Sequence, residues 1–225
     1  MTLPDRRYYT EAHGQFRDAL AHFVREEIMP QVEGWEEAGE FPRELYRKAA
    51  AVGLLGIGFP EEYGGTPADV FYHLVALDEL TSAGSGGLIA SLLSHGIGAP
   101  PILRFGSEAL KRRVLPDILS GEKISALAIT EPSGGSDVAG LLTSARLDGG
   151  EYVVNGSKMF ITSGMRADYY TVAVRTGAPG AAGVSLLLIE RERSGFTRTP
   201  LKKWAGGPRT PRRCTSTMYA YRRPI

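Results

Sequence analysis

The sequence predicts an α+β protein, in which an all-α N-terminal helical domain is followed by an antiparallel, β-barrel-like middle domain. Up to about Gly121, apolar residues recur every three or four positions, the spacing of amphipathic helices. From Ile124 onward, short apolar or alternating runs are separated by glycine, which is typical of strands and turns. A run of helices followed by a run of strands is the layout of an α+β fold. We expect a helical domain over 1–121, a β domain over 122–203 and a separate tail over 204–225.

The helical half is predicted from apolar faces and from the residues that end helices. A first helix covers residues 10–29 and ends at Pro30. A second begins at Pro42 and is followed by Gly53, at the position where a left-handed cap is common. Three further helices are predicted at 68–82, 87–95 and 107–115, the last capped by Ser107 and ended by Pro116.

The β half is predicted from alternation and glycine turns. Asp148-Gly149-Gly150 separates two alternating runs and reads as a hairpin turn. Strands are predicted over residues 124–130, 141–147, 151–155, 158–162, 169–175 and 184–189.

Charge and cysteine content exclude several classes of protein. The net charge is +1, so bulk charge indicates neither a nucleic-acid nor a membrane partner. Residues 202–225 hold seven basic residues and no acid, which leaves −6 for the rest of the chain. The one cysteine, Cys214, forms no internal disulfide and no cysteine-based metal cluster. With no apolar signal core at the N-terminus and no apolar run near the ~18 residues of a membrane helix, we expect a cytoplasmic protein.

Isolated titratable residues carry no site. His95 has no second histidine or acid at ligand spacing, so a packed or capping role is expected and no metal site is predicted. Glu79 is expected to form a structural salt bridge and not to act as a catalytic base.

The stretch from Ala128 to Gly164 holds the candidate site. Successive backbone amides in Ser133-Gly134-Gly135-Ser136 suit an anion, although a bulge and turn with capping side chains explains the same residues. The spacing matches neither a P-loop nor a dinucleotide-binding glycine fingerprint.

Two motifs in this stretch carry a resemblance to a known family. Residues 130–137 read Thr-Glu-Pro-x-x-Gly-Ser-Asp, and residues 155–164 read Asn-Gly-x-Lys-x-Phe-Ile-Thr-x-Gly. Together they closely resemble the flavin-binding middle domain of the acyl-CoA dehydrogenases. Residues 53–57 and 60–65 are similar to the N-terminal domain of that family, and the resemblance covers roughly residues 10–203.

The resemblance implies a function and a set of site residues. It implies FAD as cofactor, an acyl-CoA substrate and α,β-dehydrogenation, with an electron-transfer flavoprotein or similar acceptor. It also implies a C-terminal helical bundle, absent from this chain, which makes the tetramer and supplies the catalytic base, so no catalytic residue is assigned. Ser136 is implied to meet the CoA thioester as well as the cofactor. The implied flavin-binding residues are Leu127, Ile129, Thr130, Gly135, Ser136, Phe160 and Thr162.

The tail departs from the family after Lys203. Reading each codon one base earlier makes residues 204–222 compatible with Met-Gly-Trp-Arg-Ala-Ser-Asp-Thr-Ala-Glu-Val-Tyr-Phe-Asp-Asp-Val-Arg-Val-Pro, which follows the family pattern. We therefore hypothesise a frameshift near Lys203; the alternative is a natural basic tail for RNA or an acidic partner. As it stands, the tail is not expected to form a central strand, because Pro208 and Pro211 interrupt it and alternation is lacking.

The expected function is that of an FAD-dependent acyl-CoA dehydrogenase in a truncated, inactive form. Two alternatives remain open on the sequence. One is a flavin monooxygenase or oxidase on the same fold. The other is a non-catalytic module that binds acyl-CoA or a partner.

Overall fold

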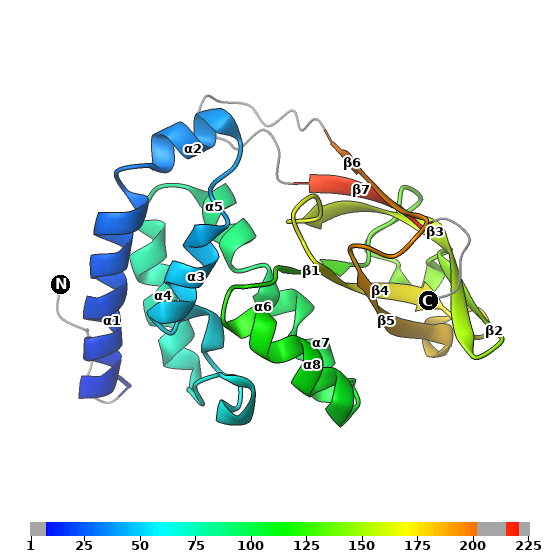
Figure 1. Ribbon diagram of the computed structural model, residues 1–225, viewed down its shortest axis with the longest axis horizontal. Helices are drawn as coiled ribbons and strands as arrows, with labels where there is room; N and C mark the ends of the chain where they lie inside the picture. The colour runs from blue at the N-terminus through cyan, green and yellow to red at the C-terminus, as the bar shows by residue number, and fades with distance from the viewer. Residues whose placement is uncertain (1–7, 202–214, 221–225) are drawn as a thin grey trace. The chain divides into compact units, whose positions relative to one another are not determined.

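The computed structural model describes residues 8–201 and the strand Thr215–Ala220 (Figure 1). The chain divides into two compact units, which are described separately. One comprises residues 8–93 with Ser107–Glu122, and the other comprises Ser94–Gly106, residues 123–201 and Thr215–Ala220.

The first unit is helical. Its helices are α1 (Glu11–Phe23), α2 (Val32–Ala38), α3 (Glu44–Ala51), α4 (Val70–Thr81), α5 (Gly86–Leu92) and α8 (Glu108–Leu119). A π-helical turn, Val24–Ile28, follows α1, and two 3-10 turns lie at Leu54–Gly56 and Glu61–Tyr63. The largest fully buried side chains at its core are Leu20, Ile28, Leu55, Leu80, Leu92, Leu115 and Ile118.

Two predicted helix features differ from the structure. Helix α8 runs through Pro116 to Leu119, so the prediction that Pro116 ends the helix was wrong. A proline inside a helix costs about 3 kcal/mol, and burial of Ile118 and Leu119 offsets it at about 1.5–3 kcal/mol each. Helix α2 was not predicted. It has only seven residues, one of them glycine, and none of its residues is buried.

The predicted helix over 87–95 is broken in two. Helix α5 ends at Leu92, and α6 (His95–Gly98) starts after a turn. The Ser94 hydroxyl at this turn donates to the backbone oxygen of Ser125 at 2.9 Å, a side-chain bond of the kind that competes with helix continuation.

No single helix among the described residues is both long and apolar enough to cross a membrane. The broken pair Gly86–Leu92 and His95–Phe105 meets that test together, by length and composition only.

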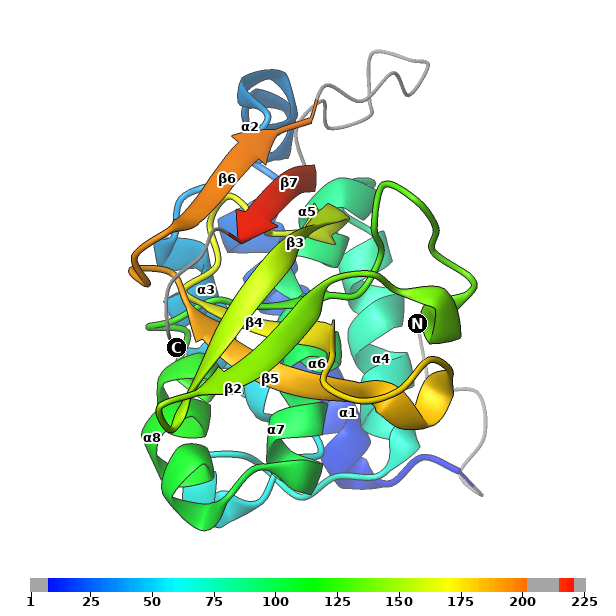
Figure 2. The same cartoon turned by 90° about the vertical axis from the view of Figure 1, so that its right-hand side faces the viewer.

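The second unit is built on a sheet (Figure 2). Its strands are β1 (Ser125–Ala128), β2 (Ser144–Asp148), β3 (Glu151–Thr162), β4 (Tyr169–Arg175), β5 (Val184–Glu190), β6 (Phe196–Pro200) and β7 (Thr215–Ala220), with α6 and α7 (Pro100–Phe105) in the same unit. The strand order is β1-β4-β2-β3-β7-β6, and β5 pairs with β4. The hairpin at Gly149-Gly150 is confirmed by the pairing of Asp148 with Glu151. The two strands predicted over 151–155 and 158–162 are the single strand β3.

The α+β fold class is confirmed, with one difference in the sheet. Two pairs are parallel: β1 with β4, in register from Ser125 opposite Tyr169 to Ala128 opposite Val172, and β2 with β4, at Ser144 opposite Arg175. The prediction had only antiparallel pairs. Parallel neighbours need a long crossover connection, and the β2–β3 hairpin lies in the chain between β1 and β4.

Helix α6 is seated closely against the start of this parallel pair. A Cβ on Gly98 would come within 2.5 Å of the Ser125 hydroxyl oxygen, so only glycine permits this approach. The Thr171 hydroxyl donates to the Gly98 carbonyl at 2.7 Å. Together with the bond from Ser94 to Ser125, these contacts fix where β1 begins and so where its far end lies.

The prediction for the tail was wrong in one respect. Thr215–Ala220 forms β7, which lies between β3 and β6 as a central strand. Both prolines that were expected to prevent this, Pro208 and Pro211, precede the strand, and residues 215–220 contain no proline. The remaining tail residues, 202–214 and 221–225, lie outside the described part of the chain.

Candidate functional site

The segment after β1 and the middle of β3 are held side by side. The Met159 backbone N–H donates to the Thr130 carbonyl at 2.8 Å. Glu131 and Gly134 exchange two backbone hydrogen bonds, at 2.9 and 3.1 Å, and so close the turn that follows. Gly135 lies against Thr130, since a Cβ at Gly135 would be 3.4 Å from the threonine methyl carbon. Thr130, Gly135 and the part of β3 next to Phe160 are therefore neighbours.

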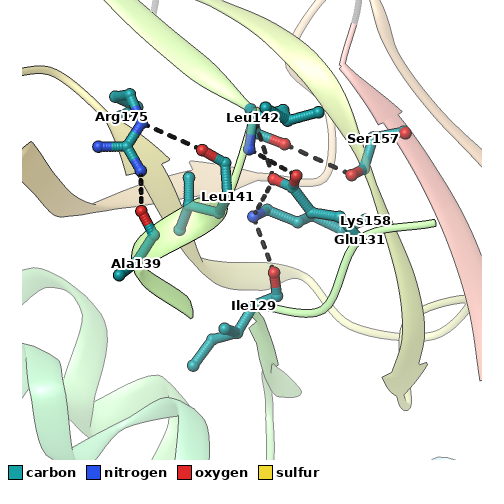
Figure 3. Close-up of polar contacts among 9 residues, drawn as sticks. Ile129, Glu131, Ala139, Leu141, Leu142, Ser157, Lys158 and Arg175 are labelled. Carbon is teal, nitrogen blue, oxygen red and sulfur yellow. Dashed lines mark hydrogen bonds and ion pairs between the residues drawn. The ribbon is translucent and has the colours of Figure 1, made fainter. Parts of the chain in front are cut away.

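A buried ion pair joins the same two segments (Figure 3). The Lys158 ammonium, on β3, lies 2.8 Å from Oε1 of Glu131, and the side chains are 1% and 4% exposed. The ammonium also donates to the Ile129 carbonyl at 2.8 Å. Lys158 therefore binds the chain on both sides of Thr130.

Glu131 also binds the strand entering the hairpin. Its Oε2 accepts the Leu142 amide at 2.6 Å, and its Oε1 accepts the Thr143 amide at 2.8 Å. Burial raises the pKa of Glu131, but the hydrogen bonds from Lys158, Thr143 and Leu142 outweigh burial and lower this pKa to about 2. Burial lowers the pKa of Lys158, and the carboxylate opposes that shift.

The strand β3 has a bulge at its centre. The β3–β7 register shifts between Lys158 and Ile161, and Phe160 has a φ of 58°. Because of the extra residue, the side chains of both Lys158 and Ile161 are buried although they are three positions apart, while Phe160 is 56% exposed. A left-handed conformation costs a non-glycine residue roughly 1–2 kcal/mol, and strain of this kind is concentrated at functional sites.

The exposed turn 133–137 is anchored at its far end. Asp137 accepts the Gly140 amide at 3.1 Å and so caps the 3-10 turn Val138–Gly140. Arg175, at the end of β4, donates to the Ala139 carbonyl at 2.6 Å and to the Leu141 carbonyl at 3.1 Å (Figure 3). It also donates to two carbonyls of the following loop, those of Ala178 and Gly180. No carboxylate bonds to Arg175 among the described residues.

The remaining predicted site residues lie around this cluster. Leu127 is half-buried on β1, opposite Thr171 of β4. Thr162 ends β3 opposite Thr215, and Ser136 is exposed on the turn. No hydrogen bond joins Leu127, Ser136 or Thr162 to one another within the described residues. The contacts described above join Thr130, Gly135 and the part of β3 next to Phe160.

The cluster fits the polar edge and the flat face of a flavin ring. Thr130 is half-buried, yet its backbone N–H and its hydroxyl have no hydrogen-bond partner in the described part of the chain. Half-buried donors without a partner suit a ligand, because a buried polar group left unpaired is costly. The exposed ring of Phe160 offers an aromatic face on the adjoining strand.

Sequence reasoning missed three residues that organise this cluster: Glu131, Lys158 and Arg175. The available signal was position. Lys158 stands in a strand motif among apolar residues, and Arg175 ends the apolar strand β4, whose preceding residues are all buried. A charged residue at an inward position requires a partner.

Other predictions about single residues are confirmed. Glu79 forms an ion pair with Arg17 at 2.7 Å, joining α4 to α1. His95 is 8% exposed, as expected of a packed histidine.

Comparisons with known proteins agree on one family. Residues 10–122 match the family model described as the acyl-CoA dehydrogenase N-terminal domain, and residues 126–216 match that of the middle domain. An acyl-CoA dehydrogenase of Bacillus subtilis is 39% identical over 191 residues, which is 84% of this chain and 50% of the relative.

Solved structures give the same result. An acyl-CoA dehydrogenase from Geobacillus kaustophilus is 37% identical with a TM-score of 0.87, over 97% of this chain and 57% of that one. A glutaryl-CoA dehydrogenase from Mycobacterium smegmatis in complex with FADH2 is 29% identical with a TM-score of 0.86, over 97% of this chain and 55% of that one. The chain spans about half the length of the curated relatives it matches.

Proposed function

The chain belongs to the acyl-CoA dehydrogenase family, and on that premise we propose that it carries the flavin-binding part of an FAD-dependent enzyme that dehydrogenates an acyl-CoA thioester between Cα and Cβ. The observation that carries this proposal is the cluster of unpartnered Thr130 donors beside the strained, exposed Phe160 ring. The related glutaryl-CoA dehydrogenase that was solved with FADH2 supports FAD as the cofactor.

Each implied residue has a role suited to its chemistry. Bound FAD would supply the hydride acceptor. Leu127 on β1 and Ile129 and Thr130 in the segment after it would line the ring, and Thr130 and Thr162 would donate hydrogen bonds to its polar edge. Phe160 would cover one face. In the turn, the backbone amides of Gly135 and Ser136 and the Ser136 hydroxyl would contact the cofactor. Ser136 would also contact the thioester.

The catalytic base is not among the residues assigned here. We propose that it belongs to a C-terminal helical domain, as do part of the FAD site and the tetramer interface. An electron-transfer flavoprotein or similar acceptor would reoxidise the cofactor. The cytoplasmic location stays a prediction from the sequence.

A direct test compares two proteins. The 225-residue chain is expected to bind FAD weakly and substoichiometrically and to show no dehydrogenase activity. The product of a gene whose frame is restored near Lys203 is expected to hold FAD stoichiometrically, and an acyl-CoA is expected to bleach its flavin absorption. Oxygen consumption by the restored protein without an acceptor would instead favour the oxidase or monooxygenase alternative. Acyl-CoA binding without bleaching would favour the binding module.

A matched pair of variants tests the site in the restored protein. Thr130→Val removes a hydroxyl at the proposed site, and FAD affinity is expected to fall about tenfold, the effect of one lost hydrogen bond of about 1.4 kcal/mol. Thr199→Val makes the same change at an exposed position on β6 and should leave affinity unchanged. Equal affinities for the two variants would argue against Thr130 as a cofactor ligand.

The frameshift hypothesis has its own test. Sequencing the gene across and beyond the Lys203 codon should reveal, in the neighbouring frame, the Met-Gly-Trp-Arg motif followed by helical-domain sequence. Immediate stop codons in that frame would leave the basic tail as the natural sequence.

A further inference from the structure

The Lys158 ammonium contacts the carbonyl side of the peptide group that joins Ile129 to Thr130. It donates to the Ile129 carbonyl at 2.8 Å. A trans peptide is planar, and its C=O and N–H point in opposite directions. The Thr130 N–H therefore points away from Lys158, and it has no hydrogen-bond partner among the described residues.

The position of that N–H is fixed from three sides. The Ile129 carbonyl before it is held by Lys158, and the Thr130 carbonyl after it accepts the Met159 amide at 2.8 Å. The next residue, Glu131, is held by Lys158 and by the Leu142 and Thr143 amides. The donor is therefore preorganised.

The ion pair is not explained by stability alone. Removing two charges from water costs several kcal/mol for each, and a buried pair often returns no more than well-packed apolar residues would. A charge on a peptide carbonyl has a second effect, because hydrogen bonds in a chain polarise one another. An ammonium on the Ile129 oxygen withdraws electron density and makes the Thr130 N–H a stronger donor.

We propose that Lys158, held in place by Glu131, is a positioning residue that orients and polarises the Thr130 N–H toward an acceptor atom on the polar edge of the flavin ring. This inference rests on the proposed function for the identity of the ligand. It adds two residues, neither of which touches the cofactor, to those that determine how strongly the cofactor is bound.

The test uses the full 225-residue chain and three variants: Lys158→Met, Glu131→Gln and the double variant that carries both. Met and Gln keep the approximate volumes while removing the charges. Each single variant leaves one buried charge without its partner, so its melting temperature should fall clearly. The double variant leaves no unpaired charge and should recover most of the loss.

The decisive readout is the Thr130 amide in ¹⁵N NMR spectra of the chain without ligand. If Lys158 polarises the peptide, the Thr130 nitrogen resonance should shift upfield in the double variant relative to the native chain, while that of Leu147 on β2, which pairs with Tyr152, stays in place. If the ion pair has a purely structural role, the Thr130 nitrogen resonance should return to its native position in the double variant, together with the stability. An unchanged Thr130 resonance in the stable double variant would overturn the proposal.

A second readout identifies the ligand, with FAD itself as probe at millimolar concentration. FAD should move the Thr130 amide resonance of the native chain. The apparent dissociation constant for FAD should be about tenfold larger for the double variant than for the native chain. If FAD leaves the Thr130 amide unmoved, the flavin is not the acceptor and the proposal falls. The proposed function fails separately, when the frame-restored protein binds FAD but no acyl-CoA reduces it.

Discussion

The Lys158 ammonium lies 2.8 Å from the Glu131 carboxylate, and the two side chains of this buried pair are 1% and 4% exposed. The pair connects three segments that are distant in sequence: the turn after β1, the entry to β2, and β3. Every residue proposed to contact a flavin except Leu127 lies within five positions of one of these two charged residues.

The pair makes the fold sensitive to acid. The pKa of Glu131 is about 2 in the folded protein and near 4.5 for an ordinary glutamate. A depressed pKa contributes stability that is present above pH 4.5 and is lost as the pH falls toward 2. We expect the free energy of unfolding of the native chain to drop by about 3 kcal/mol across this window from Glu131 alone, and much less in Glu131→Gln. Urea unfolding at a series of pH values measures how the free energy of unfolding changes with pH in the native chain and in Glu131→Gln. The same dependence on pH in both proteins would contradict the lowered pKa of Glu131.

The left-handed backbone at Phe160 is predicted to lower the stability of the folded chain. In Phe160→Gly and Phe160→Ala the same exposed ring is lost, but only glycine adopts a φ of 58° without strain. The glycine variant should therefore be more stable than the alanine variant, by about 1 kcal/mol. Both should bind FAD more weakly in the frame-restored protein. Thermal unfolding of the pair measures the difference, and an alanine variant as stable as the glycine variant would show that the bulge relaxes.

Arg175 is predicted to hold the exposed turn in place. Arg175→Met would remove the guanidinium hydrogen bonds to four backbone carbonyls and should lower the free energy of unfolding by about 2 kcal/mol. Arg175→Lys should recover less than half of that, because an ammonium lacks the planar fork that reaches several acceptors.

The control for Arg175 is Arg146, whose exposed side chain bonds Asp148 alone within the described part of the chain. Arg146→Met should change stability by no more than about 0.5 kcal/mol. Hydrogen exchange at the Gly140 and Leu141 amides should quicken in Arg175→Met and stay unchanged in Arg146→Met. Equal changes in stability and in hydrogen exchange for Arg175→Met and Arg146→Met would show that Arg175 does not hold the turn in place.

His13 and Asp69 are predicted to couple the starts of two helices. The Thr10 N–H donates to Nδ1 of His13 at 3.0 Å, which leaves the proton on Nε2, 3.0 Å from Asp69. Asp69 in turn caps α4 by accepting the Phe71 amide. A double-mutant cycle of His13→Ala and Asp69→Ala should give a coupling energy of about 1 kcal/mol. A matching cycle on the exposed pair Glu11 and Gln15, whose side chains lie 3.4 Å apart, should give a coupling energy near zero.

Local signals in the sequence were sufficient for much of the fold. The strand over 169–175 was predicted with its observed bounds, and the glycine turn after Asp148 predicted the β2–β3 hairpin. Both depend on short-range alternation and turn chemistry. The errors arose where packing between distant segments outweighs local preference, as at Pro116 in α8 and in the parallel pairing of β1 with β4.

The site divides in the same way. By itself, the sequence determined the α+β class and the two motifs that carry the family resemblance, because these are fixed by residue type and spacing along the chain. Only the tertiary structure decided that Lys158 and Glu131 pair and that Phe160 turns outward on a bulge. Burial and hydrogen-bond geometry depend on segments that meet in space, and the spacing of residues along one chain does not contain that information.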